Sequence, residues 1–327
     1  MIEPSTVSLA VLPTPLHALS HVSARLGVDV LCKRDDLTGS TLSGNKVRKL
    51  EYLLADARAQ GADTILTCGG VQSNHCRATA VAARQLGLDS VLFLRTDDVT
   101  VSPPLTGNLL LDRVIGADVR LISRADYARR LEIMGAAANV LCARGRKPYV
   151  IPEGGSNALG SLGYLRFVNE LAAQIHGPLT IVYAAGSGGT GAGLVAGVLQ
   201  HRLPWRVVGV NVCDDRAYFV NAIGSIVEEM QTRFALSIDF DRNALEIVDG
   251  YVGRGYGRAR KEELDALVHL ARTDGIVLDP VYTGKAWYGL NCELLKAPRM
   301  FGERIVFLHS GGVYGLLAQA DELSGSL

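Results

Sequence analysis

The sequence lacks an excess of charge of either sign. Its 327 residues include 33 lysines and arginines and 33 aspartates and glutamates, so the formal net charge is zero. Proteins that bind nucleic acid need a concentration of basic residues, so we expect no nucleic-acid partner. The chain also lacks an uninterrupted apolar run of about 18 residues, the length that a membrane-spanning helix needs. We therefore expect no membrane partner.

Cysteines are few and scattered, at positions 32, 68, 76, 142, 213 and 292. No two of them form a CxxC pair, and none stands at the spacing of a zinc site. We therefore expect reduced thiols and no bound metal. The first residues, Met1 to Pro4, do not show the basic and then apolar pattern of a secretory signal. These features predict a cytosolic protein.

Aromatic residues are scarce, at 6%, whereas hydrophobic residues reach 48%, enough for a sizeable core. Apolar, β-branched runs alternate with alanine-rich amphipathic stretches, which predicts an α/β protein with parallel sheets and helices on both faces. The strongest predicted strands are 64–68, 90–94, 148–151, 179–184, 207–212 and 304–308. The chain length suggests two domains, or one large domain with an inserted lobe. The glycine-containing stretch 154–160 is the expected crossing between them.

The first candidate site is the glycine-rich loop Ala185–Leu194, between a predicted strand and a predicted helix. Its backbone amides and the helix N-terminus favour an anion such as phosphate. The loop also satisfies G-x-G-x-x-G, so a nicotinamide-dependent oxidoreductase, with Asp214 on the ribose, is an alternative. Asp214 lies 28 residues after Gly186 (214 minus 186), beyond the usual spacing of about 20. Ser187 and Thr190 add hydroxyl donors, which suit a terminal monophosphate better.

A second loop, Gly69–His75, places glutamine, serine and asparagine at the start of a predicted helix. Several adjacent donors at a helix start form a site for a carboxylate, although one of them alone would serve as an ordinary N-cap. His75 and His309 are interpreted as structural histidines rather than catalytic ones. Two loop tyrosines, Tyr256 and Tyr282, stand next to glycines and are candidates for proton transfer.

Lys46 follows a Ser-Gly-Asn turn at the start of a predicted helix, in an apolar neighbourhood. This segment alone supports two interpretations. It is either a capped helix with several basic residues in its first turn, or a lysine that loses its proton and forms a Schiff base with a carbonyl cofactor.

Five motifs in order resemble the D-cysteine desulfhydrase and 1-aminocyclopropane-1-carboxylate deaminase family of pyridoxal-phosphate enzymes. They are the segments 43–51, 72–75, 186–191, 255–257 and 278–285. The segments 12–16 and 33–36 also match, so the likeness spans nearly the whole chain. The resemblance implies a two-lobed α/β fold like that of tryptophan synthase β. In this fold, residues 1–47 and 161–327 form a large cofactor-binding domain, and residues 48–160 form a small domain inserted in it. It also implies a cytosolic homodimer.

The resemblance further implies pyridoxal 5′-phosphate as cofactor and assigns roles to residues of this chain. The implied catalytic residues are Lys46, Ser73, Tyr256 and Tyr282. Cofactor contacts are expected from Lys46, Asn45, Asn74, Gly186, Ser187, Gly188, Gly189, Thr190, Thr283 and Ser310. Substrate contacts are expected from Ser73, Asn74, His75, Gly155, Tyr256 and Tyr282.

The implied reaction is α,β-elimination from a small β-substituted amino acid, with D-cysteine giving pyruvate, ammonia and sulfide. Elimination from L-cysteate or another amino acid, and β-replacement, remain alternatives. Deamination of the cyclopropane amino acid ranks lower because Thr283 stands where those deaminases carry a glutamate that protonates the pyridine nitrogen. Either Thr283 or Ser310 is expected to bond that nitrogen. A non-catalytic cofactor-binding or amino-acid-binding protein is a further alternative.

Two departures from the family pattern stand out. Ser43 occupies a position where the family usually has glycine, and Arg258 and Arg260 follow the Tyr256 motif unexpectedly. The arginines belong either to a basic helix start on the surface or to a cationic rim suited to an anionic substrate group.

Overall fold

The computed structural model describes residues 4–327. The prediction that the N-terminus is not a secretory signal rests largely on residues 1–3, which lie outside the described part. The larger of two sheets has six strands, all parallel except for the antiparallel pair β1–β2. In spatial order they are β1 (Leu16–Ala18), β2 (Asp29–Arg34), β10 (Arg304–His309), β7 (Leu179–Ala185), β8 (Trp205–Asn211) and β9 (Glu246–Val248).

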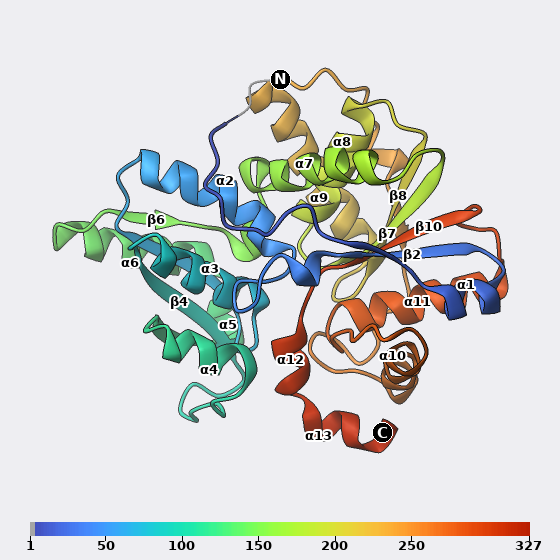
Figure 1. Cartoon of the computed structure of the whole chain (residues 1–327). Coiled ribbons are helices and arrows are strands. Elements are labelled where there is room, and N and C mark those ends of the chain that lie inside the picture. Colours follow the sequence, from blue (N-terminus) through green and yellow to red (C-terminus); the bar gives the residue numbers. More distant parts are fainter. Residues whose placement is uncertain (1–3) are drawn as a thin grey trace.

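The smaller sheet has four parallel strands, and all of them come from the middle of the sequence. In spatial order they are β5 (Asp118–Ser123), β4 (Asp89–Thr96), β3 (Thr64–Gly70) and β6 (Pro148–Val150). Figure 1 shows this sheet and its helices side by side with the larger sheet. The two-sheet α/β architecture predicted from the sequence is therefore confirmed. The proposed domain limits at 48 and 160 stay a prediction, and the first of them falls inside α2.

Helices follow most of the strands along the chain. They are α1 (Ser20–Leu26), α2 (Lys46–Ala59), α3 (Asn74–Gln85), α4 (Gly107–Val114), α5 (Arg124–Tyr127), α6 (Arg130–Ala143), α7 (Ala158–Gln174), α8 (Gly189–Gln200), α9 (Arg216–Phe234), α10 (Lys261–Asp274), α11 (Thr283–Lys296), α12 (Val313–Leu317) and α13 (Ala320–Leu323). Short 3₁₀ turns lie at Asp35–Leu37, Glu153–Gly155, Arg242–Ala244 and Ser324–Ser326.

Each sheet is buried on both faces, as its strand sequences require. In β10, Val306 and Leu308 pack into the core that holds α2, α7, α8 and α9, whereas Ile305 and Phe307 pack into the core with α1, α10 and α11. Successive side chains of a strand point to opposite faces, so a continuous apolar run supplies both cores. The smaller sheet is likewise packed between α5 and α6 on one face and α3 and α4 on the other.

The six strands predicted from the sequence are all present, within one or two residues at their ends. Four others were not predicted: β1, β2, β5 and β9. The strand β2 carries Lys33 and Arg34, so it does not look like a buried strand. Only β2 of these four is central in a sheet, and the others are edge strands that need less apolar surface.

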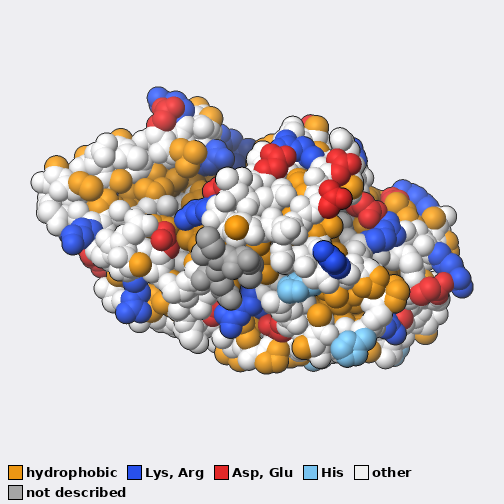
Figure 2. Space-filling view, turned by 90° about the horizontal axis from the view of Figure 1, so that it is seen from above, with side chains coloured by type: hydrophobic (Ala, Val, Ile, Leu, Met, Phe, Trp, Pro, Cys, Tyr) orange, Lys and Arg blue, Asp and Glu red, His pale blue; other side chains and the backbone are white. Residues whose placement is uncertain are grey.

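The surface charge and the character of the helices are relevant to nucleic-acid and membrane partners. Figure 2 shows acidic and basic side chains interspersed over the face seen from above, without one dominant sign. Within residues 4–327, no helix combines the length and apolar character needed to cross a membrane.

Candidate active site

A cavity of about 620 Å³ lies where the parallel strands of both sheets end. Parallel α/β sheets bind ligands at the carboxyl ends of their strands. Six strands deliver lining residues just after or at their ends: Gly70, Arg95, Pro152, Gly186, Cys213 and Ser310. The cavity also brings together most of the predicted site residues: Asn45, Lys46, Ser73, Asn74, His75, Ser187, Gly188, Thr190, Tyr256 and Tyr282.

Lys46 is the first residue of α2, and the turn before it packs against the end of β10. The Asn45 N–H donates to the Ser310 carbonyl at 3.0 Å. Gly44 adopts φ +94°, and a Cβ there would lie 2.8 Å from the Ser310 oxygen, so the turn requires glycine. Burial lowers the pKa of the Lys46 amine from 10.5 to about 8. The neutral, nucleophilic form is therefore accessible near neutral pH.

Lys49 is a second buried lysine beside the site, which the sequence reasoning missed. Its Nζ donates to the Gly154 carbonyl at 3.3 Å and to the Ser156 hydroxyl at 3.2 Å. Burial, followed by the charge of Lys46, lowers its pKa well below the ordinary value. A Cβ on Gly189 would lie 2.8 Å from the Lys49 Nζ, so the amine lies against the glycine-rich loop. The spacing of three residues from Lys46 on one helix was the available signal.

The glycine-rich loop forms the N-terminus of α8. Gly188 adopts φ +84°, and the Ser156 hydroxyl lies within 2.9 Å of the Ser187 hydroxyl. On the other side, the Asn45 amide donates to the Thr190 hydroxyl at 3.2 Å. Hydroxyls, a helix N-terminus and the nearby Lys49 together form a site for a phosphate-sized anion.

The turn before α3 has an ordered hydrogen-bond pattern. Ser73 is the N-cap, and its hydroxyl accepts from the Cys76 N–H at 3.2 Å. The side-chain oxygen of Asn74 accepts from the Asn108 amide at 3.0 Å. That bond uses the oxygen of Asn74 and leaves its NH₂ group as a donor for a cavity ligand.

His75 lines the cavity but also has a structural contact, since its Nε2 lies 2.8 Å from the Thr67 hydroxyl. Burial and then the charges of Lys46 and Lys49 lower the His75 pKa well below its usual range, so the ring is neutral at physiological pH. His309 is buried, and its Nε2 lies 3.0 Å from the Val277 carbonyl.

The two tyrosines form a hydrogen-bonded pair in the cavity. The hydroxyls of Tyr256 and Tyr282 lie 2.7 Å apart, and their rings pack edge to face. Burial raises the pKa of Tyr256 to about 12 and that of Tyr282 well above its usual value, so both hydroxyls are protonated at neutral pH. The Tyr256 ring lies over Gly70, where a Cβ would approach it to 3.4 Å.

Three predicted contact residues do not line the cavity: Gly155, Gly189 and Thr283. Gly155 and Gly189 are backbone positions next to lining residues. The Thr283 side chain is fully buried, and its hydroxyl donates to the Asp279 carboxylate at 2.6 Å. Of the two hydroxyls expected at the pyridine nitrogen, only that of Ser310 belongs to a lining residue.

The unexpected residues of the sequence lie away from the cavity. Arg258 is exposed, and Arg260 is the N-cap residue of α10, with its guanidinium 2.8 Å from Glu263. Neither lines the cavity, so the basic-helix-start interpretation describes them and the cationic-rim interpretation does not. Ser43 is buried without a positive φ, which explains why a residue with a side chain fits there. Its carbonyl accepts from Arg77 at 3.2 Å.

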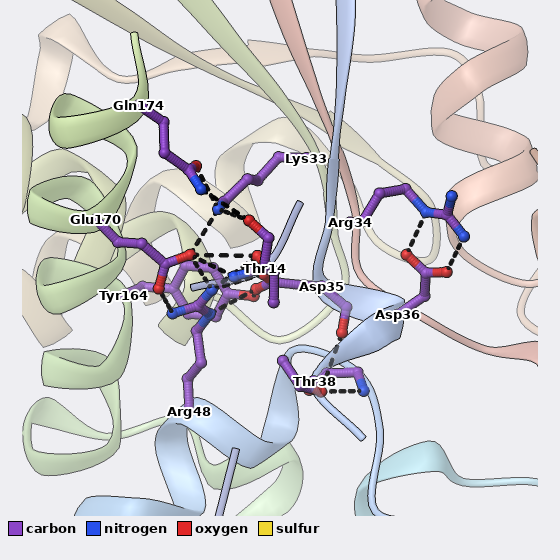
Figure 3. A network of polar contacts seen from close by, with 11 residues as sticks. Thr14, Lys33, Arg34, Asp35, Asp36, Thr38, Arg48, Tyr164, Glu170 and Gln174 are labelled. Carbon is purple, nitrogen blue, oxygen red and sulfur yellow. Dashed lines mark hydrogen bonds and ion pairs between the residues drawn. The ribbon is translucent and has the colours of Figure 1, made fainter. Parts of the chain in front are cut away.

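A buried ionic network anchors α2 behind the cavity (Figure 3). Arg48 donates to Asp35 at 2.8 Å and to Glu170 of α7 at 2.9 Å. Glu170 also pairs with Lys33 of β2, and Tyr164 donates to Asp35 at 2.6 Å. The network therefore joins α2, β2 and α7 within two residues of Lys46.

Comparisons with known proteins show the family of this chain. The family model described as "Pyridoxal-phosphate dependent enzyme" matches residues 7–311. A mitochondrial bifunctional D-cysteine desulfhydrase/1-aminocyclopropane-1-carboxylate deaminase of Arabidopsis thaliana is 42% identical, over 98% of this chain and 81% of that protein. The chain belongs to this family of pyridoxal-phosphate enzymes. A putative 1-aminocyclopropane-1-carboxylate deaminase of Thermotoga maritima is 43% identical, over 97% of this chain and 99% of that one.

Solved structures give the same result for the fold. A homologue of 1-aminocyclopropane-1-carboxylate deaminase superposes with a TM-score of 0.92 and 39% identity, covering 99% of this chain and 97% of that one. A fungal L-serine ammonia-lyase from Rhizomucor miehei has a TM-score of 0.69 at 19% identity, over 98% and 99% of the two chains. This family enzyme is thus a pyridoxal-phosphate-dependent lyase, and the nicotinamide-binding and non-catalytic alternatives are set aside.

The residues present fit the cofactor. The amine of Lys46 lines the same cavity as the glycine-rich loop, and adding a Cβ to Gly186 would bring it within 3.1 Å of the Tyr282 ring. Pyridoxal phosphate needs a neutral lysine amine for its aldehyde and an anion site for its phosphate, and this cavity has both a lysine of lowered pKa and an anion site.

Proposed function

We propose that this enzyme catalyses α,β-elimination on a small β-substituted amino acid, with D-cysteine as the lead substrate. The observation that carries the proposal is the placement of a base and an acid in one cavity. Lys46 has a pKa of about 8, and the Tyr256–Tyr282 pair supplies protonated hydroxyls. Elimination needs both, because a proton leaves Cα and the departing group takes up charge or a proton.

The cofactor-holding residues follow from the geometry. Bound pyridoxal phosphate supplies a ring that withdraws electrons from the substrate Cα. We propose that Lys46 bonds to its carbonyl carbon, and that the Ser187–Thr190 loop with Lys49 holds its phosphate. Asn74, whose NH₂ group is left free by Asn108, would donate to the ring hydroxyl.

The residue that bonds to the pyridine nitrogen of the cofactor affects whether elimination or cyclopropane ring opening is favoured. We assign Ser310 to this nitrogen, because Ser310 lines the cavity and Thr283 is bonded to Asp279. A hydroxyl does not hold the nitrogen protonated as a carboxylate would. The electron demand on Cα is therefore weaker, which favours departure of a β-substituent over opening of a cyclopropane.

The substrate is held by the remaining lining residues. Ser73, Asn74 and His75 at the start of α3 would bind the α-carboxylate, with helix-terminal N–H groups adding to the attraction. The amine of Lys46 would take the Cα proton. Tyr256 and Tyr282 face the substrate and stabilise or protonate the departing group. Gly155 lies behind His75, where a Cβ would come within 3.7 Å of the imidazole ring, so its part in substrate binding would be to leave room for that ring.

The experiment is a screen for keto-acid release by the purified holoenzyme. Pyruvate is measured with D-cysteine, L-cysteine, L-cysteate, β-chloro-D-alanine and 2,3-diaminopropionate, and 2-oxobutyrate with the cyclopropane amino acid. We expect pyruvate from D-cysteine. A keto acid from the cyclopropane substrate alone would refute the elimination proposal. A new amino acid formed only when a second nucleophile is added, without pyruvate, would instead favour β-replacement.

Uptake of the cofactor should depend on pH through Lys46. Only the neutral amine attacks a carbonyl, so the reactive fraction rises as the pH passes the pKa of about 8. When pyridoxal phosphate is added to cofactor-free protein, the rate at which the visible absorption band grows should be half-maximal near pH 8. A rate that still climbs steeply above pH 10, as for a lysine of ordinary pKa, would contradict the assignment.

The homodimer and the cytosolic location remain proposals that rest on the family resemblance. Sedimentation of the purified holoenzyme at several concentrations would test the first of them.

A further inference from the structure

Arg95 is a cation of the cavity wall that neither the sequence motifs nor the assigned roles account for. It lies near the carboxyl end of β4, in register with Gly70 at the end of β3. Its guanidinium carbon is 5.0 Å from the centroid of the Tyr256 ring and 4.8 Å from that of the Tyr127 ring. Arg95 and both tyrosines line the cavity.

Arg95 forms no ion pair among the described residues, although Glu153 and Asp214 are acidic residues of the same lining. Lys46, Arg95 and Arg130 are the lysine and arginine residues of the lining. Lys46 is assigned to the cofactor, and Arg130 forms an ion pair of 3.1 Å with Glu153. Within residues 4–327, Arg95 has neither an acidic side chain within ion-pair distance nor a hydrogen-bond acceptor.

The contacts with the two tyrosine rings position the guanidinium of Arg95 without using its hydrogen-bond donors. A cation–π contact is made by the charge over the ring and leaves the five N–H groups of a guanidinium free. The nearest acidic residue in sequence, Asp97, is exposed and is paired with Arg124, and the charge of Arg95 acts on it more weakly than that of Arg124. Arg95 is therefore a preformed cation whose donors are available to an anion in the cavity.

The place of Arg95 indicates which anion it receives. The α-carboxylate is assigned to the start of α3 and the phosphate to the start of α8, each with its own donors. Arg95 instead stands against Tyr256, the residue proposed to face the departing group. The remaining negative charge of the reaction is the one that develops on that group when its bond to Cβ breaks.

We propose that Arg95 is a specificity-determining residue that binds negative charge on the β-substituent. This inference rests on the proposed elimination. The Cα proton passes to Lys46, the Cβ–S bond breaks and its electron pair stays on sulfur, which departs as hydrosulfide from cysteine or as sulfite from cysteate. Water then converts the released 2-aminoacrylate to pyruvate and ammonia. The enzyme thus selects thiol or sulfonate amino acids over those whose substituent is an ammonium.

The test compares substrates within each enzyme form. For the wild-type holoenzyme and Arg95→Gln, kcat/KM is measured for cysteine, cysteate, β-chloroalanine and 2,3-diaminopropionate, using the enantiomers that react. Chloride departs readily without help, so β-chloroalanine is the reference. Loss of a charge-assisted hydrogen bond should lower the ratio of cysteate to β-chloroalanine by about 10- to 100-fold. The ratio of 2,3-diaminopropionate to β-chloroalanine should rise.

Two variants sharpen this comparison. Arg95→Lys keeps the charge but not the planar fork of donors, so it should restore part of the ratio. Arg258→Gln removes an equal charge from an exposed residue outside the lining and should leave the ratios unchanged. An equal loss on every substrate in Arg95→Gln would overturn the proposal, because it would mean that Arg95 serves the shared carboxylate or only the fold.

A binding measurement separates this inference from the proposed function. By calorimetry, the wild-type holoenzyme should bind 3-sulfopropanoate, which lacks the amine and cannot react, more tightly than propanoate. Arg95→Gln should remove this preference. If no amino acid yields pyruvate but the wild type still prefers 3-sulfopropanoate to propanoate, the proposed elimination is refuted and the anion subsite is supported. Equal affinity for both compounds in the wild type would overturn the subsite.

Discussion

Replacing Lys46 by alanine should lower the rate of pyruvate release by about 10²- to 10⁴-fold, the usual contribution of a positioned proton-transfer group. It should also abolish the visible absorption band of the holoenzyme. Both effects follow because one amine is assigned to hold the cofactor and to take the Cα proton. Steady-state kinetics and absorption spectra of the purified variant measure them.

The neighbouring lysine is the matched control for this variant. Lys49→Met removes a buried amine of the same helix that contacts Gly154 and Ser156 beside the phosphate loop. It should weaken cofactor affinity while the band persists at saturating cofactor. Addition of a small primary amine should restore part of the activity of Lys46→Ala. Full activity and an intact band in Lys46→Ala without added amine would refute the role of Lys46.

Replacing Arg48 by methionine should lower the free energy of unfolding by about 3–5 kcal/mol, the usual cost of breaking a buried ion pair. Arg48 is 1% exposed, and its loss removes the cation that pairs with the fully buried Asp35. Urea unfolding of the cofactor-free protein measures the change, provided that the m-value is unchanged. Arg304→Met, which breaks the half-exposed pair with Asp29, should cost only about 0.2–1 kcal/mol. Equal losses in the two variants would contradict the energetic role of the network.

The same network sets the response to acid. Burial alone would raise the pKa of Glu170, but its bonds and charge interactions with Arg48 and Lys33 outweigh burial and lower it from 4.5 to about 2. A lowered folded-state pKa gives stability that is present above pH 4.5 and lost as the pH falls towards 2. The difference in unfolding free energy between the wild type and Arg48→Met should therefore be largest above pH 4.5 and shrink as the pH falls towards 2, which urea unfolding at several pH values measures.

The sequence predicted the strands and site loops whose signal is local. The six predicted strands are mainly apolar, and the loops after two of them supply Ser73, Ser187 and Thr190 to the cavity that Lys46 also lines. The strand β2 was missed because the charge of Lys33 is buried against Glu170 and Gln174, which lie far along the chain. Pairing of that kind cannot be read from local periodicity.

The same limit explains the site residues that were misplaced or missed. Thr283 follows a cavity tyrosine in sequence, but the start of α11 turns its side chain to Asp279. Arg95 stands in an ordinary strand sequence. Arg95 is placed at the site by the strand register with Gly70 and by its contact with the ring of Tyr256. Tyr256 lies 161 residues later in the chain (256 minus 95). The tertiary fold, rather than any motif, creates this cationic wall.

The most direct test of the account is to map the cofactor attachment. The holoenzyme is reduced with borohydride and digested, and the modified lysine is identified by mass spectrometry. The account predicts one phosphopyridoxyl adduct, on Lys46, with the fully buried Lys49 three residues away unmodified. An adduct on Lys49, or none on either lysine, would contradict it.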